Sequence, residues 1–495
     1  MHLSRRQFLK FGVRAGAALA LAPLGCRWRQ STPTPSPDVW VNDIHSQLNL
    51  TRVRHVSRPS SVEELAAIVK RGNTLSIAGG RHAAGGQQFL TDGELVDMRG
   101  LNRVLSLDTE HGIVEAEAGI LWPELMDELA RRQAEWGIVQ KQGVDRMTLG
   151  GSLGANIHGN GLGLPPIVAQ IESFKLMDAT GAVRMCSRTE NAELFSLVAG
   201  GYGVFGPVAS VRLRLMRRHK LRVEAHMADI PDVVPTFAQR QADGCRYGDW
   251  HYSPDAASND FLRRGVLVTY RPLDEREETP ATDAPLFTSG DWVRLVTLAH
   301  VNRSEAFARY TESALRQNGN VVWSDTFQRD RVYADDYHAV VDRELHARAP
   351  ASESLVEFFV PREALPAFFD EVRADFLRHD VALLYGTVRL VERDSESFLA
   401  WARVPVACVV FNFHVVHDEA GQRALAETFR RVVDITARHG GTFYLTYHRF
   451  ATRAQTERCH PRFVEFLRAK RHYDPGEVFQ SDWYRHHRAM FANSI

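Results

Sequence analysis

The sequence is poor in cysteine, has no long apolar run and carries no net charge, and each of these absences excludes a class of protein. Its 495 residues include five cysteines, spread singly from Cys26 to Cys459, so neither a zinc site nor a dense disulfide framework is expected. No stretch of eighteen apolar residues occurs, which excludes an ordinary membrane-spanning helix. The 60 basic and 60 acidic side chains balance, and without a concentrated positive field no nucleic-acid partner is expected.

The remaining composition is that of a globular protein. Hydrophobic residues make up 44% of the chain and charged residues 24%, so most of it is expected to fold. A chain of 495 residues has room for two or three domains with a buried core in each.

The first residues are predicted to be a targeting segment. Residues 4–10 read Ser-Arg-Arg-Gln-Phe-Leu-Lys, the pattern of a twin-arginine export signal, and an alanine-rich apolar run follows. We therefore expect a signal peptide over residues 1–30, a Pro-rich tether over 31–37 and a folded part from Asp38. Cys26 follows Pro-Leu-Gly, a partial match to a lipoprotein box. Two outcomes stay open: a membrane-anchored lipoprotein with lipid on Cys26, or cleavage and release into the periplasm.

The next part of the chain alternates strands, helices and glycine-rich loops. Apolar periodicity predicts helices over 62–70, 122–132 and 192–198, strands over 74–78, 95–98, 113–118 and 208–215, and a hairpin over 171–186. Glycine-rich loops are predicted over 79–86 and 148–161. Glycine lets the backbone approach closely and turn N–H groups toward phosphate oxygens, so these loops suit a dinucleotide pyrophosphate. Two tight turns at a sheet edge are the alternative interpretation.

One further glycine motif does not indicate a nicotinamide site. Residues Gly201–Gly206 fit the pattern G-x-G-x-x-G, but that motif binds pyrophosphate through a helix that starts directly after the glycines. Here apolar and polar residues alternate over 208–215, which predicts a strand with one wet face.

Taken together, the motifs resemble the PCMH-type FAD-binding domain of the vanillyl-alcohol oxidase superfamily. The segments that carry the resemblance are Arg58–Ser61 (RPSS), Ala78–His82 (AGGRH), Val96–Met98 (VDM), Ala118–Gly119, Thr148–Gly159 (TLGG…HG) and Tyr202–Gly206 (YGVFG). The C-terminal segments Gly440–Tyr444, His460–Phe466 and Asp474–Phe479 are similar to the aldonolactone oxidase, alditol oxidase and decaprenylphosphoryl-ribose oxidase branches.

The resemblance implies an α+β fold with three parts. An FAD-binding domain of two α/β subdomains is expected over 38–217, and an α+β substrate domain with an antiparallel sheet over 218–440. Residues 441–495 are expected to return to the FAD-binding domain.

The resemblance also implies the residues that hold FAD. His82 occupies the position at which many members carry FAD covalently, so covalent attachment is expected there; a plain polar loop histidine is the alternative. His158 is expected near the flavin. The full expected set is Ala78, Gly79, Gly80, Arg81, His82, Ala83, Gly85, Gly86, Gly119, Thr148, Gly150, Gly151, Ser152, Gly154, Asn156, His158, Gly159, Gly206 and Val208.

The implied catalytic residues depart from the family pattern. Arg389 matches the arginine of an E-x-R segment, but Thr387 replaces its acid. Asn412 and His414 resemble a substrate-facing pair on one strand face; a structural role for His414 is the alternative. The family's lysine, which supports the reduced flavin, falls within Leu445–Arg449, and Tyr447 with His448 are the expected donor and base there.

These features favour an exported FAD-dependent oxidase or dehydrogenase. It is expected to oxidise a CH–OH group of a sugar, polyol or lactone and to pass electrons to oxygen or another acceptor, with no metal. An amine donor, as in cytokinin dehydrogenase, is the first alternative, because Gly85–Gln88 resembles that branch equally well. A flavin-binding protein without catalysis is the second.

Overall fold

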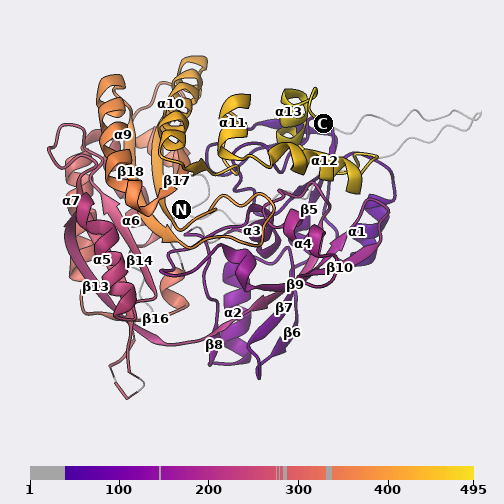
Figure 1. Cartoon of the computed structure of the whole chain (residues 1–495), viewed down its shortest axis with the longest axis horizontal. Coiled ribbons are helices and arrows are strands. Elements are labelled where there is room, and N and C mark those ends of the chain that lie inside the picture. The colour runs from indigo at the N-terminus through magenta and orange to yellow at the C-terminus, as the bar shows by residue number, and fades with distance from the viewer. Residues whose placement is uncertain (1–38, 144–145, 275, 278, 282–286, 330–336) are drawn as a thin grey trace, which may run out of the picture. The chain divides into compact units, whose positions relative to one another are not determined.

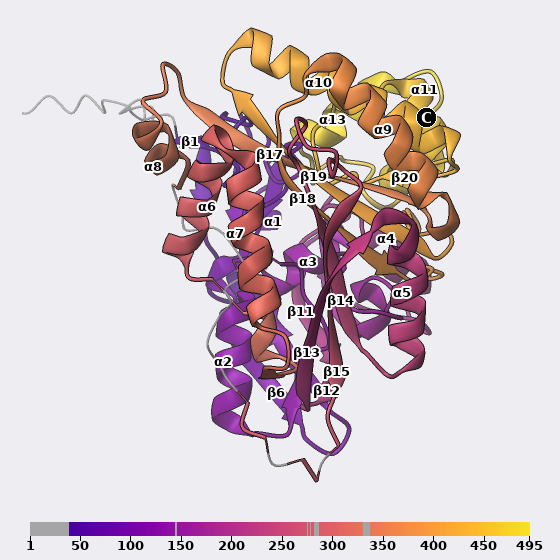
Figure 2. The same ribbon diagram turned by 90° about the vertical axis from the view of Figure 1, so that its left-hand side faces the viewer.

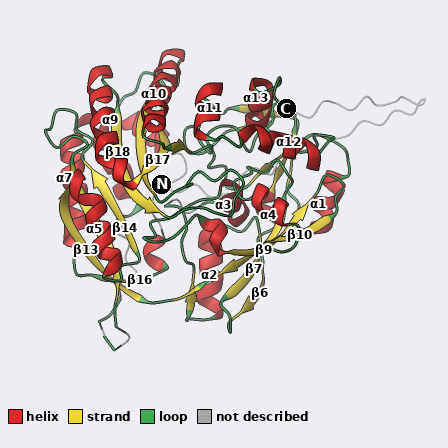
Figure 3. Cartoon of the chain, in the orientation of Figure 1, coloured by secondary structure: helices red, strands yellow, loops and turns green. Residues whose placement is uncertain are grey.

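The computed structural model describes residues 39–143, 146–274, 276–277, 279–281, 287–329 and 337–495. The predicted export signal, the tether and Cys26 therefore lie outside the described residues. Helices and strands alternate through the described part, which confirms the predicted α+β class (Figure 3). Within these ranges, no helix combines the length and the apolar character needed to cross a bilayer.

The first subdomain is built on a small parallel sheet. Its strands lie in the order β3-β5-β4, and helix α1 packs against them through Leu65, Ile68 and Val69. The helix begins where Ser61 Oγ accepts a hydrogen bond from the Glu64 amide at 3.2 Å. The elements are β1 Val39–Val41, β2 Thr51–Val53, β3 His55–Ser57, α1 Val62–Val69, β4 Leu75–Ala78 and β5 Glu94–Asp97.

The second subdomain is an antiparallel sheet with helices beside it. The strand order is β10-β9-β11-β7-β6 in the described residues. Strand β11 begins at Val208, two residues after Gly206, so the predicted absence of a helix after this glycine motif is confirmed. The elements are β6 Val104–Asp108, β7 Ile113–Glu117, α2 Trp122–Arg132, β8 Trp136–Gly137, α3 Leu149–Ala155, β9 Ile171–Met177, β10 Val183–Ser187, α4 Ala192–Val198, β11 Val208–Arg214 and β12 Met216–Arg217.

The predicted loop over 148–161 is wrong in its first half, where α3 forms. Thr148 caps this helix by accepting a hydrogen bond on Oγ1 from the Gly151 amide at 3.1 Å. Leu149 and Leu153 then bury one face of the helix in the core. Capping and burial together outweigh the low helix propensity of the glycines in this segment.

A long antiparallel sheet forms the third layer of the molecule. Its order is β16-β13-β15-β14-β18-β19-β17-β20, with α5, α9 and α10 on one face and α6, α7 and α8 on the other (Figures 1 and 2). The strands are β13 Lys220–Asp229, β14 Tyr247–Tyr252, β15 Arg264–Pro272, β16 Val321–Trp323, β17 Ala351–Pro361, β18 Leu383–Val391, β19 Val406–Val416 and β20 Thr442–Phe443. The helices are α5 Ile230–Ala242, α6 Ser289–Val301, α7 Arg303–Arg316, α8 Tyr337–Glu344, α9 Leu365–His379 and α10 Glu419–Arg438.

Alternation along β19 sorts its side chains between the two faces. Phe411 and Phe413 pack against Phe376 of α9. Val410 points to the opposite face, where it lines a cavity, and Asn412 lies on that same face because side chains alternate along a strand. This face is covered by α6 and α7 rather than by α9 and α10.

The C-terminal segment is tied to the first subdomain by backbone pairing. Its helices are α11 Arg453–Cys459, α12 Phe463–Tyr473 and α13 Asp482–Met490. The Leu75 amide donates to the Val478 carbonyl at 2.7 Å and the Gln480 amide donates to the Leu75 carbonyl at 2.8 Å. A buried ion pair between Lys470 and Asp474 precedes this contact, and Asp474 also accepts from the Phe479 amide at 2.9 Å.

We expect Asp474→Ala to destabilise the protein strongly. The substitution would leave the Lys470 ammonium, whose side chain is 0% exposed, without its buried counter-charge. Removing one partner of a buried pair costs about 3–5 kcal/mol, which urea unfolding would measure as a lower free energy of unfolding. Arg423→Ala, which breaks an exposed pair with Glu419 on α10, is the control and should cost less than about 1 kcal/mol. Equal losses in the two variants would contradict this prediction.

Candidate functional site

One cavity of about 350 Å³ joins the glycine segments to the long sheet. Its volume lies within the range of small-molecule sites. Segments from both subdomains, from the sheet and from the C-terminal segment contribute to its wall. The expected residues that line it are Gly79, Gly80, Arg81, His82, Ala83, Thr148, Gly150, Gly151, Gly154, Gly206, Val208, Arg389 and Tyr447.

The two glycine segments meet at one end of this cavity. A Cβ atom on Gly79 would lie 2.1 Å from Thr148 Oγ1, and one on Gly80 would lie 2.1 Å from the Arg146 carbonyl oxygen. Side chains are therefore excluded at both positions, and backbone forms this part of the wall. The close approach is the physical reason for glycine here.

His82 follows these glycines with its ring held from one side. Its Nδ1 atom lies 3.1 Å from His45 Nε2, and the two rings meet edge to face. Its Nε2 atom is buried and has no hydrogen-bond partner among the described residues. Burial lowers the pKa of both rings, to about 4 for His45 and well below the ordinary value for His82. Both imidazoles are therefore neutral near pH 7, and the His82 ring has a nitrogen available.

Several expected cofactor residues do not line the cavity. Ser152 Oγ accepts from Trp122 Nε1 at 2.9 Å, and Asn156 Nδ2 donates to Asp394 at 2.9 Å. A Cβ atom on Gly119 would meet the Met98 carbonyl oxygen at 1.8 Å. These residues shape the glycine segments from behind. Five other expected residues also do not line the cavity: Ala78, Gly85, Gly86, His158 and Gly159.

Arg389 stands in the cavity wall at the sheet end. Its Nη1 atom donates to Gln142 Oε1 at 2.9 Å, and its Nε atom is buried without a partner among the described residues. Thr387, two positions earlier on β18, also lines the cavity, and its buried hydroxyl has no partner in the described part of the chain. At this end of the cavity, Arg389 Nε and the Thr387 hydroxyl are therefore available to hydrogen-bond to a ligand.

Glu357 is a site residue that the sequence analysis missed. It lies on β17, is 2% exposed and lines the cavity near Arg389 and Tyr447. Gln142 Nε2 donates to its Oε1 atom at 3.1 Å, and His158 Nε2 lies 3.1 Å from its Oε2 atom. A single acid within the apolar run Leu355–Val360 was the signal that could have revealed it.

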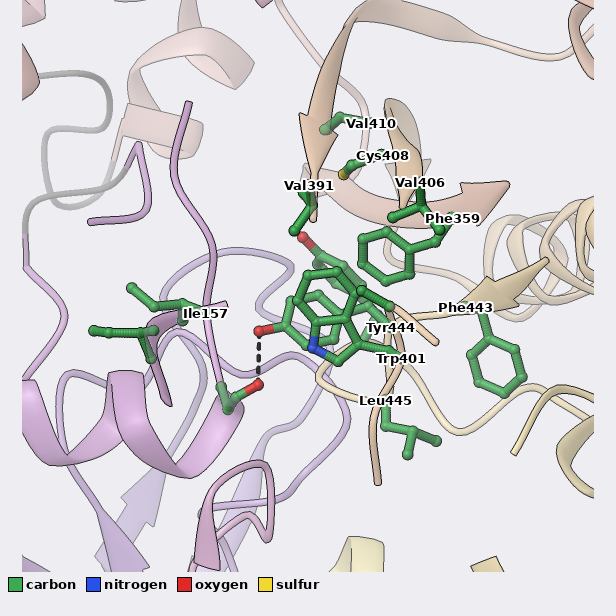
Figure 4. Packing of buried hydrophobic residues seen from close by; sticks show 14 of the residues in the cluster. Ile157, Phe359, Val391, Trp401, Val406, Cys408, Val410, Phe443, Tyr444 and Leu445 are labelled. Atoms are coloured by element: carbon green, nitrogen blue, oxygen red, sulfur yellow. Dashed lines mark hydrogen bonds between the residues drawn. The ribbon is translucent and has the colours of Figure 1, made fainter. Parts of the chain in front are cut away.

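An aromatic cluster supports this region from behind. Phe359 and Trp401 stack with ring centroids 4.1 Å apart, and Figure 4 shows Tyr444 beside them, close to Ile157. The Tyr444 hydroxyl donates to the Ala155 carbonyl at 2.8 Å. The cluster therefore connects the second glycine segment to the long sheet.

Three of the expected catalytic residues, Asn412, His414 and His448, do not line the cavity. The Asn412 side chain is 0% exposed, and its amide has no partner among the described residues. His414 meets the His300 ring at 4.6 Å, in a cluster that includes Glu353. His448 stacks on Phe450, and burial lowers its pKa to about 4. Tyr447 does line the cavity, and burial raises the pKa of its hydroxyl, which therefore remains protonated.

Comparison with known proteins agrees with this geometry. The model of the FAD binding domain matches residues 53–187, which include both glycine segments. The chain is 25% identical over 442 residues to L-gulono-1,4-lactone dehydrogenase of Mycobacterium tuberculosis, covering 87% of this chain and 95% of the relative.

Two further relatives cover different shares of the chain. L-gulonolactone oxidase of Bos taurus is 28% identical over 181 residues, 36% of this chain and 40% of the relative. Cytokinin dehydrogenase 3 of Arabidopsis thaliana is 23% identical over 454 residues, 84% of this chain and 82% of the relative. The chain is therefore an FAD-dependent oxidoreductase, related to the lactone oxidases and dehydrogenases.

Proposed function

We propose that this protein oxidises a CH–OH group of a sugar lactone, a polyol or a similar hydroxylated small molecule. The observation that carries the proposal is the continuous cavity that runs from the glycine segments to the polar groups around Arg389. A cofactor held at the first end would place its reactive part toward the second, where a donor needs hydrogen-bonding groups.

The residues at the glycine end fit FAD. Backbone replaces side chains at Gly79 and Gly80, and apolar side chains such as Ile77 and Met98 line the wall beside them. When bound, FAD takes a hydride from the donor carbon and passes the electrons to oxygen or another acceptor. The chain's own residues exclude water, hold the donor and manage its hydroxyl proton.

The groups at the sheet end suit an oxygen-rich donor. Arg389 Nε and Thr387 Oγ1 offer a buried charged donor and a buried hydroxyl. Unpartnered groups of this kind favour a ligand that hydrogen-bonds to them and penalise one that does not. The names of the lactone-oxidising relatives support the same donor class. An amine donor is the second candidate, because the cytokinin dehydrogenase relative covers a comparable share of the chain.

Anaerobic flavin reduction separates the two donor classes. We expect L-gulono-1,4-lactone, L-galactono-1,4-lactone or an alditol to bleach the visible flavin band, and a cytokinin to leave it unchanged. Arg389→Ala should raise the donor concentration needed for half-maximal reduction by roughly 10- to 100-fold, the loss of one charge-assisted hydrogen bond. Arg393→Ala, at an exposed position beyond the same strand, is the control. Faster reduction by the cytokinin would replace this proposal with the amine alternative.

We also propose that His82 forms a covalent bond to FAD through Nε2. This ring nitrogen is buried in the cavity region without a partner, while Nδ1 faces His45. The reactive form is the tautomer with its proton on Nδ1, toward His45, because this form places the lone pair on Nε2, where a nucleophile needs it. The new N–C bond would replace a hydrogen of the flavin methyl group. Two electrons and two protons would leave, and the electrons would go to oxygen or the other acceptor that serves turnover.

Acid precipitation tests the covalent bond directly. We expect the wild-type pellet to stay yellow, and the His82→Ala pellet to be colourless with its flavin in the supernatant. His45→Ala should lower the covalently bound fraction, because it removes the group that orients the His82 ring. His111→Ala, at an exposed turn, is the matched control and should keep the wild-type colour. A colourless wild-type pellet would contradict the covalent bond while leaving the FAD site in place.

Export by the twin-arginine route is proposed from the sequence pattern. Arg5 and Arg6 stand in the segment Ser4–Lys10, ahead of the apolar run. In a bacterial host with this pathway, the wild-type chain should reach the periplasm or the membrane fraction. The double variant Arg5→Lys/Arg6→Lys should remain in the cytoplasm with its leader uncleaved, as seen by fractionation and immunoblotting. Unchanged fractionation of the double variant would contradict this route, and mass spectrometry of the mature N-terminus would decide between lipid on Cys26 and simple cleavage.

A further inference from the structure

The oxidation of an alcohol releases a proton that a group in the cavity wall must accept. As the hydride leaves the donor carbon, the O–H bond breaks and a C=O bond forms, so one hydroxyl proton needs a base. Thr387 on β18 stands where the E-x-R pattern has an acid. A threonine hydroxyl is too weakly basic to accept the donor's proton. A base must therefore come from another element.

Glu357 reaches the same place from the neighbouring part of the sheet. Its register partner on β19 is Val410, and the register partner of Thr387 on β18 is also Val410, so the two side chains flank the same position. Glu357, Thr387 and Val410 all line the cavity. The long sheet therefore brings a carboxylate from β17 to the region where the E-x-R pattern lacks one on β18.

Four neighbours contact the Glu357 carboxyl. Gln142 and His158 each approach one oxygen at 3.1 Å, and the Tyr447 hydroxyl and the Cys408 thiol also hydrogen-bond to it. A carboxylate has about four acceptor positions, so a donor hydroxyl must replace one of these contacts to reach Glu357. Gln142 also accepts from Arg389 at 2.9 Å, so Arg389, Gln142 and Glu357 form one connected group. His158 Nδ1 faces the Gly159 carbonyl at 3.1 Å, which fixes the orientation of the ring behind the carboxylate.

The Glu357 carboxyl is in the ionised form that a base requires, and its lowered pKa also makes it a weaker base than an ordinary carboxylate. Burial alone raises the pKa of its carboxyl, but His158 and Arg389 more than offset this, and the pKa falls below its ordinary value. Tyr447 and Cys408 also face the carboxyl, and burial raises the pKa of both, so they remain protonated. Among these neighbours, Glu357 is the group that is ionised and able to take a proton near pH 7.

One other carboxylate in the lining requires comparison. Asp249 lies on β14, is 3% exposed and lines the cavity. Asn160 Nδ2 donates to its Oδ2 atom at 2.7 Å, and His251 lies 3.4 Å from its Oδ1 atom. Its neighbours Asn160 and His251 differ from those of Glu357, and its removal serves as a test of the assignment.

We propose that Glu357 is the general base that accepts the donor's hydroxyl proton, with Arg389 holding the donor oxygen and His158 positioning the carboxylate. This proposal rests on the proposed function. The hydride and its two electrons go to FAD, the proton goes to a Glu357 carboxylate oxygen, and the donor leaves as a carbonyl compound. The proton is lost to water when the product departs.

Anaerobic stopped-flow reduction by the best hydroxylated donor tests this assignment. Glu357→Gln keeps the size of the side chain and removes the basic carboxylate. We expect it to slow flavin reduction at saturating donor by about 10²- to 10⁴-fold, the usual contribution of a general base. FAD content and reduction by dithionite should remain as in the wild type. Acetate added to Glu357→Ala should restore part of the rate.

A matched control uses the same strand. Glu353→Gln removes another buried carboxylate of β17, one that contacts His300 and His338 and does not line the cavity. In this variant the donor should reduce the flavin at a rate within a few-fold of the wild-type rate. An infrared difference spectrum after reduction should show a new protonated carboxyl band in the wild type and in Glu353→Gln, and no such band in Glu357→Gln.

Several results would overturn the assignment. The first is flavin reduction in Glu357→Gln at a rate within ten-fold of the wild type. The second is loss of the infrared band in Asp249→Asn instead of Glu357→Gln. The third is loss of FAD from both Glu357→Gln and Glu357→Asp, which would show that the residue has a structural role. A wild-type enzyme that no hydroxylated donor reduces would fail differently, because it would remove the proposed function before any variant is compared.

Discussion

A buried contact between His158 and Glu357 connects the two halves of this molecule. The imidazole follows the second glycine segment and the carboxylate stands on the long sheet, with side chains that are 1% and 3% exposed. At that depth each group needs polar partners, because an unpaired buried charge or ring nitrogen carries a large desolvation cost. The cavity lies along this junction, so the contact that joins the halves also shapes the place where cofactor and donor would meet.

Neighbouring contacts make the junction rigid. Tyr444 donates to the Ala155 carbonyl, and Asn156 donates to Asp394, so the middle of the second glycine segment is held by two hydrogen bonds from later parts of the chain. The C-terminal segment adds a backbone connection to the first glycine segment, because the Ala84 amide donates to the Thr446 carbonyl at 2.9 Å. Such polar contacts depend on geometry more than apolar packing does, and they hold the cavity wall in one arrangement.

Much of the nucleotide-binding part could be predicted from the sequence. The helices over 122–132 and 192–198 and the strand over 171–177 have the expected bounds, because each depends on a local apolar pattern and local capping. The glycines at 79 and 80 were expected to let the backbone approach a ligand closely, and in the structure a side chain at either position would clash with its neighbours. The loop expected over 148–161 was partly wrong, because the Thr148 cap and two buried leucines favour a helix that glycine content disguises.

By itself, the sequence determined the α+β class, the FAD-binding motifs and the place of His82, since all of these depend on residues close together along the chain. Tertiary structure alone decided which acid stands beside Arg389. Glu357, Gln142 and His158 lie far apart in sequence and meet through strand register and the packing of the glycine segment on the sheet. The same register and packing leave Asn412, His414 and His448 outside the cavity lining. A local sequence motif does not predict those long-range pairings, because the free energy that selects them comes from burial across the whole fold.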